Sequence, residues 1–178
     1  MYPKLEEIGL HHQSAFLNAM SDYEQNDPKM FKILYPQKDS WTTKAFAKYV
    51  AECQKQKQDW RPGPNKISTT TYVLLESQDV ICGFGRMRFP LTDKTEKHGG
   101  NLEFDVPPSR RGQGYGALTL NRMLFEAVRA GLARVLLTCP TAQLAAIKCI
   151  EKNRGVFKDE IYGLEDLPPI SRFWINFR

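Results

Sequence analysis

The residues best suited to chemistry lie together in one short glycine-rich stretch. Arg110-Arg111-Gly112-Gln113-Gly114-Tyr115-Gly116-Ala117 separates a strand-like segment from a helix-like one. Three glycines in five residues remove Cβ atoms from the loop, so its backbone N–H groups can converge on a bulky group. The next segment, 117–130, has the pattern of a helix, whose N-terminus carries unpaired donors and a partial positive charge. With two arginines beside it, the loop predicts a site for a phosphate or pyrophosphate.

Two familiar phosphate-binding loops fit this stretch poorly. A P-loop needs a lysine after its last glycine, and none follows the glycines here. Gly112-x-Gly114-x-x-Ala117 matches a relaxed dinucleotide-binding pattern, which also needs an acidic residue about 20 residues further on. The strand in that place, ending at 137–140, has no acid, and a hairpin precedes the loop instead of a first βαβ unit. We therefore rank dinucleotide binding low.

The spacing Arg111-x-x-Gly114-x-Gly116 resembles the pyrophosphate-binding signature of the GNAT superfamily of acyl-CoA-dependent N-acyltransferases. The order of elements extends this likeness, because a strand precedes the loop and a helix, an apolar strand and a second helix follow it. Further landmarks resemble a bacterial group of GNAT acetyltransferases assigned by sequence. These are Gly99-Gly100-Asn101, Leu137-Thr138-Cys139, Ile150-Glu151-Lys152-Asn153 and Arg172-Phe173-Trp174-Ile175. The likeness runs from about Thr69 to the C-terminus and is weaker in the first 68 residues.

The resemblance implies an acetyl-CoA site made by the loop and the strand before it. The loop amides would hold the CoA pyrophosphate, with the helix dipole behind them and the Arg111 guanidinium beside them. Pantetheine would enter a gap between the strands ending at Val106 and Cys139. Gln143 stands where many members have an Asn that bonds the cofactor arm. The implied cofactor-binding residues are Phe104, Val106, Arg111, Gly112, Gln113, Gly114, Tyr115, Gly116, Ala117 and Gln143.

The implied catalytic residues depart from the usual pattern of the superfamily. Ile150 stands where many members have a Tyr that protonates the leaving thiolate, and Thr138 where some have a Glu base. The thiolate can leave without that acid, because a thiol pKa near 8.5 is low compared with that of an amine. A base must still take the proton of the amine, and Glu103, followed by Asp105, is our candidate because its strand passes the thioester. A backbone N–H near Val106 would polarise the thioester carbonyl.

The flanking segments predict a single α/β domain, residues 1–178, with a central mixed, mostly antiparallel sheet flanked by helices. Residues 1–68 would form a helical N-terminal part, and 69–178 the sheet and the cofactor-binding core. Periodicity and turn residues predict helices over 9–25, 42–58, 117–130 and 141–153, and strands over 69–75, 80–89, 101–106, 134–139, 156–162 and 171–177. We expect Thr141 to cap its helix. The polar loop 92–100 and the turn Trp60-Arg61-Pro62 would rim an acceptor pocket.

Composition indicates an ordinary globular protein of 178 residues, 42% hydrophobic and 25% charged, with a net charge of +5. Neither a signal-peptide core nor an apolar run near 18 residues occurs, so we expect a cytoplasmic protein without a membrane segment. Four scattered cysteines indicate core residues instead of disulfides. The histidines lack metal-ligand spacing, so we expect no metal site and a solvent-exposed pair at His11 and His12.

The sequence thus predicts an N-acetyltransferase that moves the acetyl group of acetyl-CoA to a primary amine by direct attack in a ternary complex. The acceptor stays open between a small amine, an antibiotic, an amino-acid derivative and a protein amine. Ile150 leaves open a non-catalytic acyl-CoA-binding module. Net positive charge leaves open a nucleic-acid-binding domain, although lysines alternate with acids and we expect no nucleic-acid partner. An exposed closing strand around 171–177 could support a homodimer.

Overall fold

The computed structural model describes residues 3–34, 41–58, 67–162 and 168–177. Its helices are α1 (Gln13–Asn26), α2 (Pro28–Leu34), α3 (Thr43–Gln58), α4 (Asp93–Lys97), α5 (Tyr115–Arg129) and α6 (Leu144–Lys152). Its strands are β1 (Lys4–Glu7), β2 (Ser68–Ser77), β3 (Val80–Phe89), β4 (Leu102–Asp105), β5 (Arg134–Pro140), β6 (Val156–Ile161) and β7 (Ile170–Asn176). Every predicted helix and strand is present, with ends that differ by a few residues. β1, α2 and α4 were not predicted.

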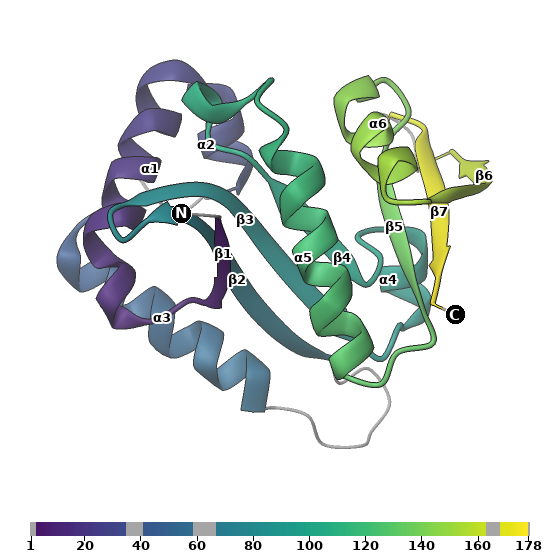
Figure 1. The fold of residues 1–178 in the computed structure, drawn as a ribbon, viewed down its shortest axis with the longest axis horizontal. Helices are drawn as coiled ribbons and strands as arrows, with labels where there is room; N and C mark the ends of the chain where they lie inside the picture. The colour runs from purple at the N-terminus through teal and green to yellow at the C-terminus, as the bar shows by residue number, and fades with distance from the viewer. Residues whose placement is uncertain (1–2, 35–40, 59–66, 163–167, 178) are drawn as a thin grey trace.

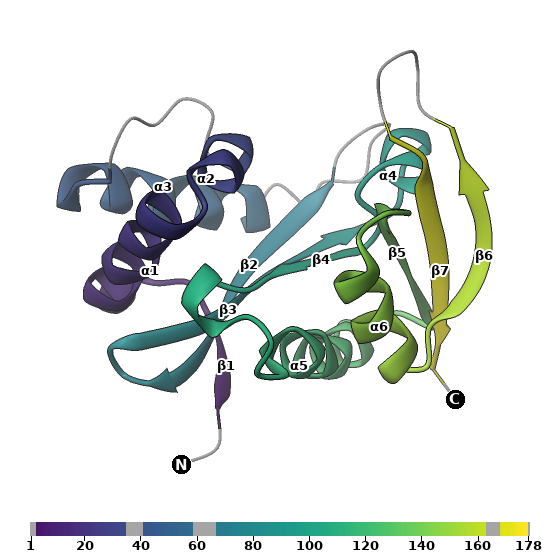
Figure 2. The same cartoon turned by 90° about the horizontal axis from the view of Figure 1, so that it is seen from above.

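The strands form two antiparallel sheets in place of the one mixed sheet that we expected. The first has the order β1-β2-β3-β4 and the second the order β5-β7-β6. Helices α1, α2 and α3 cover one face of the first sheet, and α5 lies on its other face (Figures 1 and 2). The predicted α/β class, with antiparallel strands flanked by helices, is confirmed.

Strand β3 shows why the first sheet takes helices on both faces. Phe84 packs with the core cluster that contains residues of α1 and α3, whereas Met87 packs with the cluster that contains residues of α5. On the α5 face, a Cβ atom at Gly85 would lie 2.3 Å from the sulfur of Met123, so a larger residue here would have to displace the Met123 side chain. Period-two alternation in β3 thus separates an α5 face from a face that carries Phe84, Arg86 and Arg88.

One asparagine joins the two sheets just before β4 begins. The Asn101 N–H donates to the Leu136 carbonyl of β5 (2.7 Å), and the Leu136 N–H donates to Asn101 Oδ1 (2.8 Å). Toward β3, Asn101 Nδ2 donates to the Arg88 carbonyl (3.0 Å), and the Arg88 N–H donates to the Asn101 carbonyl (2.7 Å). The Asn101 residue is only 3% exposed. Beyond this junction β4 and β5 belong to different sheets, so a gap lies between them, as expected.

Two local predictions about helix ends differ from the structure. The loop 92–100 contains α4, because Thr92 and Thr95 form a reciprocal capping box at its start. Thr141 does not cap α6: its hydroxyl is bonded to Glu160 and Ser171, and the N-cap residue is Gln143. Both differences come from hydrogen bonds of threonine side chains, which the spacing of hydrophobic residues in the sequence does not predict.

The edge of the second sheet also differs from our expectation. β7 pairs with β5 on one side and with β6 on the other, so the segment 171–177 is an inner strand. The argument for a homodimer through this segment therefore loses its basis. In the described part of the chain, no helix has the length and apolar character needed to cross a membrane.

We predict that Asn101→Ala strongly destabilises the fold. It leaves the Leu136 N–H and the Arg88 carbonyl without their side-chain partners, and each unsatisfied buried group costs about 1–3 kcal/mol. The free energy of unfolding should fall by about 2–5 kcal/mol, which lowers the melting midpoint by roughly 5–15 °C. Thermal and urea melts measure this, with exposed Asn26→Ala as the matched control. Equal midpoints for the two variants would contradict a joining role for Asn101.

Candidate active site

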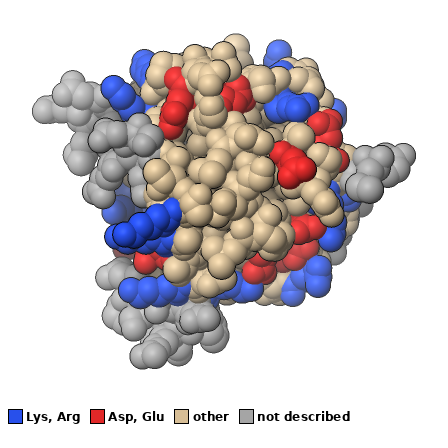
Figure 3. Space-filling view, turned by 90° about the vertical axis from the view of Figure 1, so that its left-hand side faces the viewer, with Lys and Arg blue, Asp and Glu red and all other residues tan. Residues whose placement is uncertain are grey.

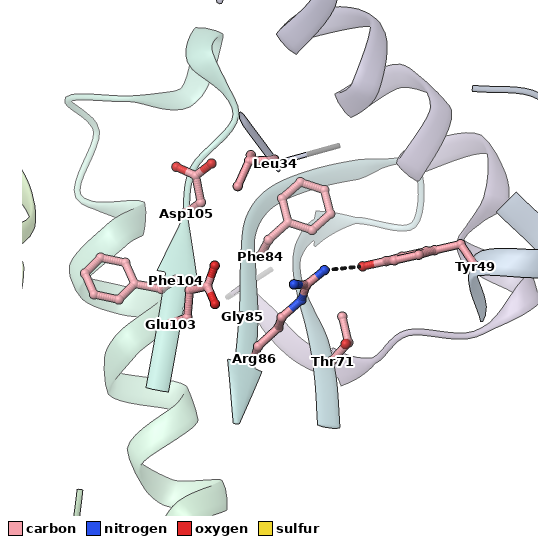
Figure 4. Close-up of a pocket in the computed structure, with 9 residues that line it drawn as sticks. All are labelled: Leu34, Tyr49, Thr71, Phe84, Gly85, Arg86, Glu103, Phe104 and Asp105. Atoms are coloured by element: carbon pink, nitrogen blue, oxygen red, sulfur yellow. Dashed lines mark hydrogen bonds between the residues drawn. The ribbon is translucent and has the colours of Figure 1, made fainter. Parts of the chain in front are cut away.

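Two cavities meet at strand β4. One is a cleft of about 360 Å³ between β4 on one side and β5 with the start of α6 on the other. The second, hereafter the acceptor-side pocket, lies between the β2–β3–β4 face and residues of α2 and α3 (Figure 4). Leu34, Glu103, Phe104 and Asp105 line both cavities. β4 therefore forms a wall between the cleft and the acceptor-side pocket, whose volume is about 40 Å³.

The β4 backbone offers hydrogen-bonding groups to the cleft. In the β3–β4 register, Arg86 lies opposite Glu103 and Phe84 lies opposite Asp105. The Arg88 N–H donates to the Asn101 carbonyl one step earlier in the same series of alternate positions, so these pairs are the hydrogen-bonded ones. Because antiparallel pairs alternate, the N–H and C=O of Phe104 point away from β3 and toward the gap. An extended amide chain such as pantetheine can pair with them.

The glycine loop presents a row of backbone donors at the start of α5. Gly112 and Gly114 have φ values of 75° and 87°, and Gly114 is the N-cap residue of α5. These left-handed conformations favour glycine and turn the loop tightly into the helix. Among the described residues, the N–H groups of 112–117 have no recorded hydrogen-bond partner. At Gly116 a Cβ atom would lie 3.1 Å from Cys149 Sγ, so this glycine lets α5 approach α6.

Side chains of the loop anchor it to the rest of the fold. Tyr115 Oη donates a short hydrogen bond to Glu76 at the end of β2, and Arg110 pairs with the same carboxylate at 3.0 Å. The bond to Glu76 raises the pKa of Tyr115. Gln113 Nε2 donates to the Ser109 carbonyl, and Ser109 in turn donates to Asp22 of α1. Tyr115 and Gln113 thus hold the loop in shape through their side chains.

Arg111, expected beside the pyrophosphate, makes contacts on the α1–α2 side of the loop. Its Nε donates to the Val106 carbonyl (3.1 Å), and one terminal nitrogen pairs with Asp27 Oδ2 (2.6 Å). The same guanidinium lies over the Tyr23 ring, 5.9 Å from its centroid. Arg111 therefore fixes the end of β4 against α1 and α2.

Asp105 is the more enclosed of the two candidate bases. Tyr23 Oη donates to its Oδ2 at 2.6 Å, and the Val106 N–H donates to its Oδ1 at 2.8 Å. Burial raises the pKa of Asp105 above its ordinary value, although the two hydrogen bonds and the charge of Arg111 act in the opposite direction. The Val106 N–H, expected to polarise the thioester carbonyl, is occupied by the Asp105 carboxylate in this structure.

Glu103 has an ion-pair partner and is more open. Its carboxylate accepts a short hydrogen bond from Arg88, and its side chain is 42% exposed. Figure 4 shows Glu103 pointing into the acceptor-side pocket and Phe104 pointing away from it, as alternation along a strand requires.

The remaining predicted positions line or close the cleft. Ile150 is 1% exposed and belongs to the core cluster under α5 and α6, so it offers no proton donor. Thr138 accepts the Gly99 N–H through its hydroxyl (2.9 Å) and so closes the base of the gap. Gln143 lines the cleft at the start of α6. The turn Trp60-Arg61-Pro62 lies outside the described residues.

Several residues of the acceptor-side pocket were missed in the sequence, namely Leu34, Tyr49, Thr71, Phe84 and Arg86. A signal for Arg86 was present in β3, because Phe84, Arg86 and Arg88 alternate with small or apolar residues. An arginine on a strand face that a helical layer covers needs a partner or a ligand. For the pocket residues of α2 and α3, no local pattern distinguishes pocket from core.

The His11–His12 pair differs from our expectation, since His12 is only 1% exposed. The ligand atoms of Glu6, His11 and His12 all lie within 4.8 Å of one another, a spacing that a metal ion can use. However, the Gly9 N–H donates to His12 Nδ1 (3.0 Å), which places the ring proton on Nε2, facing Glu6 at 3.3 Å. A protonated Nε2 is a hydrogen-bond donor and not a metal ligand, so the cluster is best described as a hydrogen-bonded start of α1.

Charge on the surface does not favour a nucleic-acid groove on the face drawn in Figure 3. Basic and acidic side chains both occur around a broad uncharged area there. Binding to a polyanion instead requires a continuous basic stripe.

Unpartnered backbone donors at a helix N-terminus and an open gap between two strands together suit a long, phosphate-bearing ligand such as the acetyl-CoA that the sequence resemblance implies. Comparison with protein families gives the same result: the acetyltransferase (GNAT) family model matches residues 28–156, and the chain belongs to that family. It is therefore an acetyl-CoA-dependent N-acetyltransferase, as the sequence predicted. No curated protein sequence matched the chain.

Solved structures share the fold at low sequence identity. RimL, a ribosomal L7/L12 alpha-N-protein acetyltransferase in complex with coenzyme A, is 12% identical, with TM-score 0.67 and coverage of 98% of this chain and 93% of that one. YncA from Salmonella typhimurium with its cofactor acetyl-CoA is 13% identical, with TM-score 0.62 and coverage of 98% and 93%. A spermidine N-acetyltransferase SpeG chimera from Vibrio cholerae and hSSAT is 12% identical, with TM-score 0.64 and coverage of 99% and 96%.

We predict that acetyl-CoA and CoA raise the melting midpoint and that Gly114→Glu abolishes this effect. A ligand at 100 times its Kd stabilises by about 2.7 kcal/mol, or roughly 5–10 °C for a chain of this size. A carboxylate at the N-cap repels phosphate and covers the loop donors. Thermal melting of both proteins, with and without each ligand, measures the change.

Gly131→Glu is the matched control for this variant. Gly131 also has a left-handed φ (81°) and open space where a Cβ would stand, but it follows the other end of α5. Both variants therefore carry similar backbone strain. Loss of the CoA response in both would show that strain, and not the site, is responsible.

Proposed function

We propose that the chain acetylates a primary amine by direct attack in a ternary complex, with acetyl-CoA in the β4–β5 cleft and the amine in the acceptor-side pocket. The observation that supports this arrangement is the set of residues that both cavities share, above all Glu103 and Asp105. When bound, acetyl-CoA supplies the carbonyl carbon that is attacked and the thiolate that leaves. The new N–C bond forms as the C–S bond breaks, and the electron pair departs with sulfur.

Asp105 is the base that we propose, ahead of Glu103. A raised pKa makes a carboxylate a stronger base, and the Tyr23 and Val106 bonds fix its orientation while leaving one lone pair on each oxygen. Glu103 is instead engaged in an ion pair with Arg88, and its side chain is 42% exposed, so it is held less firmly at the boundary of the two cavities. Glu103 then helps to shape the acceptor-side pocket.

The loop amides of 112–117 would hold the pyrophosphate, and the Phe104 N–H, which faces the gap, would polarise the thioester carbonyl in place of Val106. Gln143 would reach the cofactor arm from the start of α6. Arg111 would position the loop through Asp27 and Val106. Because Ile150 cannot donate a proton, the thiolate would depart without a side-chain acid. The low basicity of a thiolate allows this.

The acceptor is an amine on either a small molecule or a protein. RimL is named for a protein α-amine and SpeG for spermidine, so the shared fold accommodates both kinds. Our sequence-based predictions of a cytoplasmic location and of no nucleic-acid or membrane partner stand as predictions.

We predict that Asp105→Asn lowers kcat by roughly 10²–10³-fold, because it removes the base but keeps the shape. Glu103→Gln should cost at most about tenfold. In the wild type, the acid limb of kcat/KM includes the ionisation of Asp105 at a pH above 3.8, since burial raises its pKa, and the Asn variant should lose that ionisation. Initial rates of CoA thiol release between pH 4 and 9 test this.

The melting response to acetyl-CoA serves as the control, since neither substitution touches the glycine loop. A larger loss for Glu103→Gln than for Asp105→Asn would reverse the assignment of the base. Binding of acetyl-CoA without turnover of any amine would favour the non-catalytic module.

A further inference from the structure

The acceptor-side pocket is narrow. Its volume is about 40 Å³, which is room for about three groups of the size of a water molecule or a methylene. An amine nitrogen and the first two carbons of its chain are three such groups. The pocket therefore suits the end of an acceptor molecule, while the rest of the acceptor lies outside it.

The walls of the pocket are aromatic side chains that the core holds in place. Phe84 of β3 and Tyr49 of α3 both pair with the buried ring of Phe16, at centroid distances of 6.0 and 5.5 Å. Tyr49 also packs against Trp41 (5.3 Å), and its hydroxyl accepts a hydrogen bond from Arg86 (3.4 Å; Figure 4). Because protein cores are close-packed, these walls cannot move apart without repacking the core. The fold thus sets the width of the pocket.

The base that we propose is fixed to the same aromatic core. Asp105 lines both the pocket and the cleft, and it accepts a hydrogen bond from Tyr23, whose ring lies 6.4 Å from that of Phe84. An amine that gives its proton to Asp105 must bring its nitrogen between these walls. The carbon attached to that nitrogen then lies where space is most limited.

We propose that the acceptor amine ends an unbranched chain and that an amine on a branched carbon is excluded. This inference rests on the proposed function and names the substrate class of that site. A branched carbon next to nitrogen continues in two directions, so it adds at least a fourth group between the walls. Leu34, Tyr49 and Phe84 give those walls an apolar character, which suits the methylenes of a linear chain.

The accepted and excluded amines are chemically distinct. Linear alkylamines, the ends of polyamines and the side-chain amine of lysine all carry nitrogen on an unbranched carbon. The α-amines of most amino acids and of most protein N-termini lie on a branched carbon. The inference thus separates acceptors that the proposed function alone treats as equivalent.

Isomeric amines give the direct test. Butylamine and sec-butylamine contain the same atoms and differ in the branch next to nitrogen. We expect kcat/KM for butylamine to be about 10- to 100-fold higher, because one extra methyl group must be forced into a close-packed space. The uncatalysed reaction of each amine with a thioester is the control, and the enzymatic ratio is corrected for this intrinsic difference in reactivity.

Three larger acceptors identify the source of the linear amine. They are spermidine, a peptide whose only amine is a lysine side chain, and a peptide whose only amine is its N-terminus on a branched carbon. We expect the fastest of the three to be spermidine or the lysine peptide. Release of the CoA thiol measures all of these rates.

A wider pocket should relax the preference. Leu34 is partly buried and lines the pocket, so Leu34→Ala should raise kcat/KM for sec-butylamine and reduce the ratio of the two isomers to within about threefold. Leu10→Ala is the matched control, since Leu10 is 61% exposed and does not line the pocket. It should keep the wild-type ratio.

A smaller pocket should slow every amine. Thr71 lines the pocket and is 5% exposed, and within the described part of the chain its hydroxyl makes no hydrogen bond. Thr71→Ile adds a methyl group there and should lower kcat/KM for butylamine about tenfold. Thr71→Val has the shape of threonine and breaks no recorded hydrogen bond, so it should stay within about threefold of the wild type. The melting response to acetyl-CoA should be the same in all of these variants.

Each outcome decides the inference. A corrected isomer ratio near one, or a faster reaction of sec-butylamine, would overturn it while leaving the proposed function intact. The same holds if the N-terminal peptide reacts faster than both spermidine and the lysine peptide. An unchanged ratio in Leu34→Ala together with an unchanged rate in Thr71→Ile would show that the amine binds elsewhere. A melting response to acetyl-CoA without acetylation of any amine would instead remove the proposed function and the inference together.

Discussion

The site depends on one junction, the set of hydrogen bonds that Asn101 makes to β3 and β5. Backbone and side chain together bind the Leu136 peptide on one sheet and the Arg88 peptide on the other. Because this contact lies just before β4, the strand starts against β5 and then continues only with β3. A fully paired sheet would have no room for pantetheine, and two unconnected sheets would not hold the cleft at a fixed width.

Alternation along β4 then gives the strand two different sides. The Phe104 ring packs with the core under α5, whereas Glu103 and Asp105 face the acceptor-side pocket. The backbone N–H and C=O of Phe104 point toward the cleft. In the arrangement that we propose, the four residues of β4 separate the thioester from the amine, and Asp105 borders both spaces.

The sequence made the scaffold predictable where the signal is local. The glycines at 112 and 114 predict a tight turn, and both have left-handed backbone conformations in the structure. The alternation of residues over β3 predicts that strand. The contacts that decide roles are not local. Asp105 receives its hydrogen bond from Tyr23, 82 residues away, and Arg111 finds Asp27 at a separation of 84 residues. Sequence reasoning could therefore name Asp105 and Arg111, but it could not find Tyr23 and Asp27, whose contacts lead us to propose Asp105 ahead of Glu103 as the base and a positioning role for Arg111.

Burial connects the choice of base with the choice of acceptor. An amine in water is mostly protonated and cannot attack, and a carboxylate in water is too weak a base to help it. The desolvated pocket raises the pKa of Asp105 and, by the same effect, lowers the pKa of an amine that enters it. The two pKa values approach each other, so proton transfer becomes less unfavourable. Desolvation also weakens the binding of an amine, so an acceptor needs further contacts with the walls of the acceptor-side pocket to offset that loss.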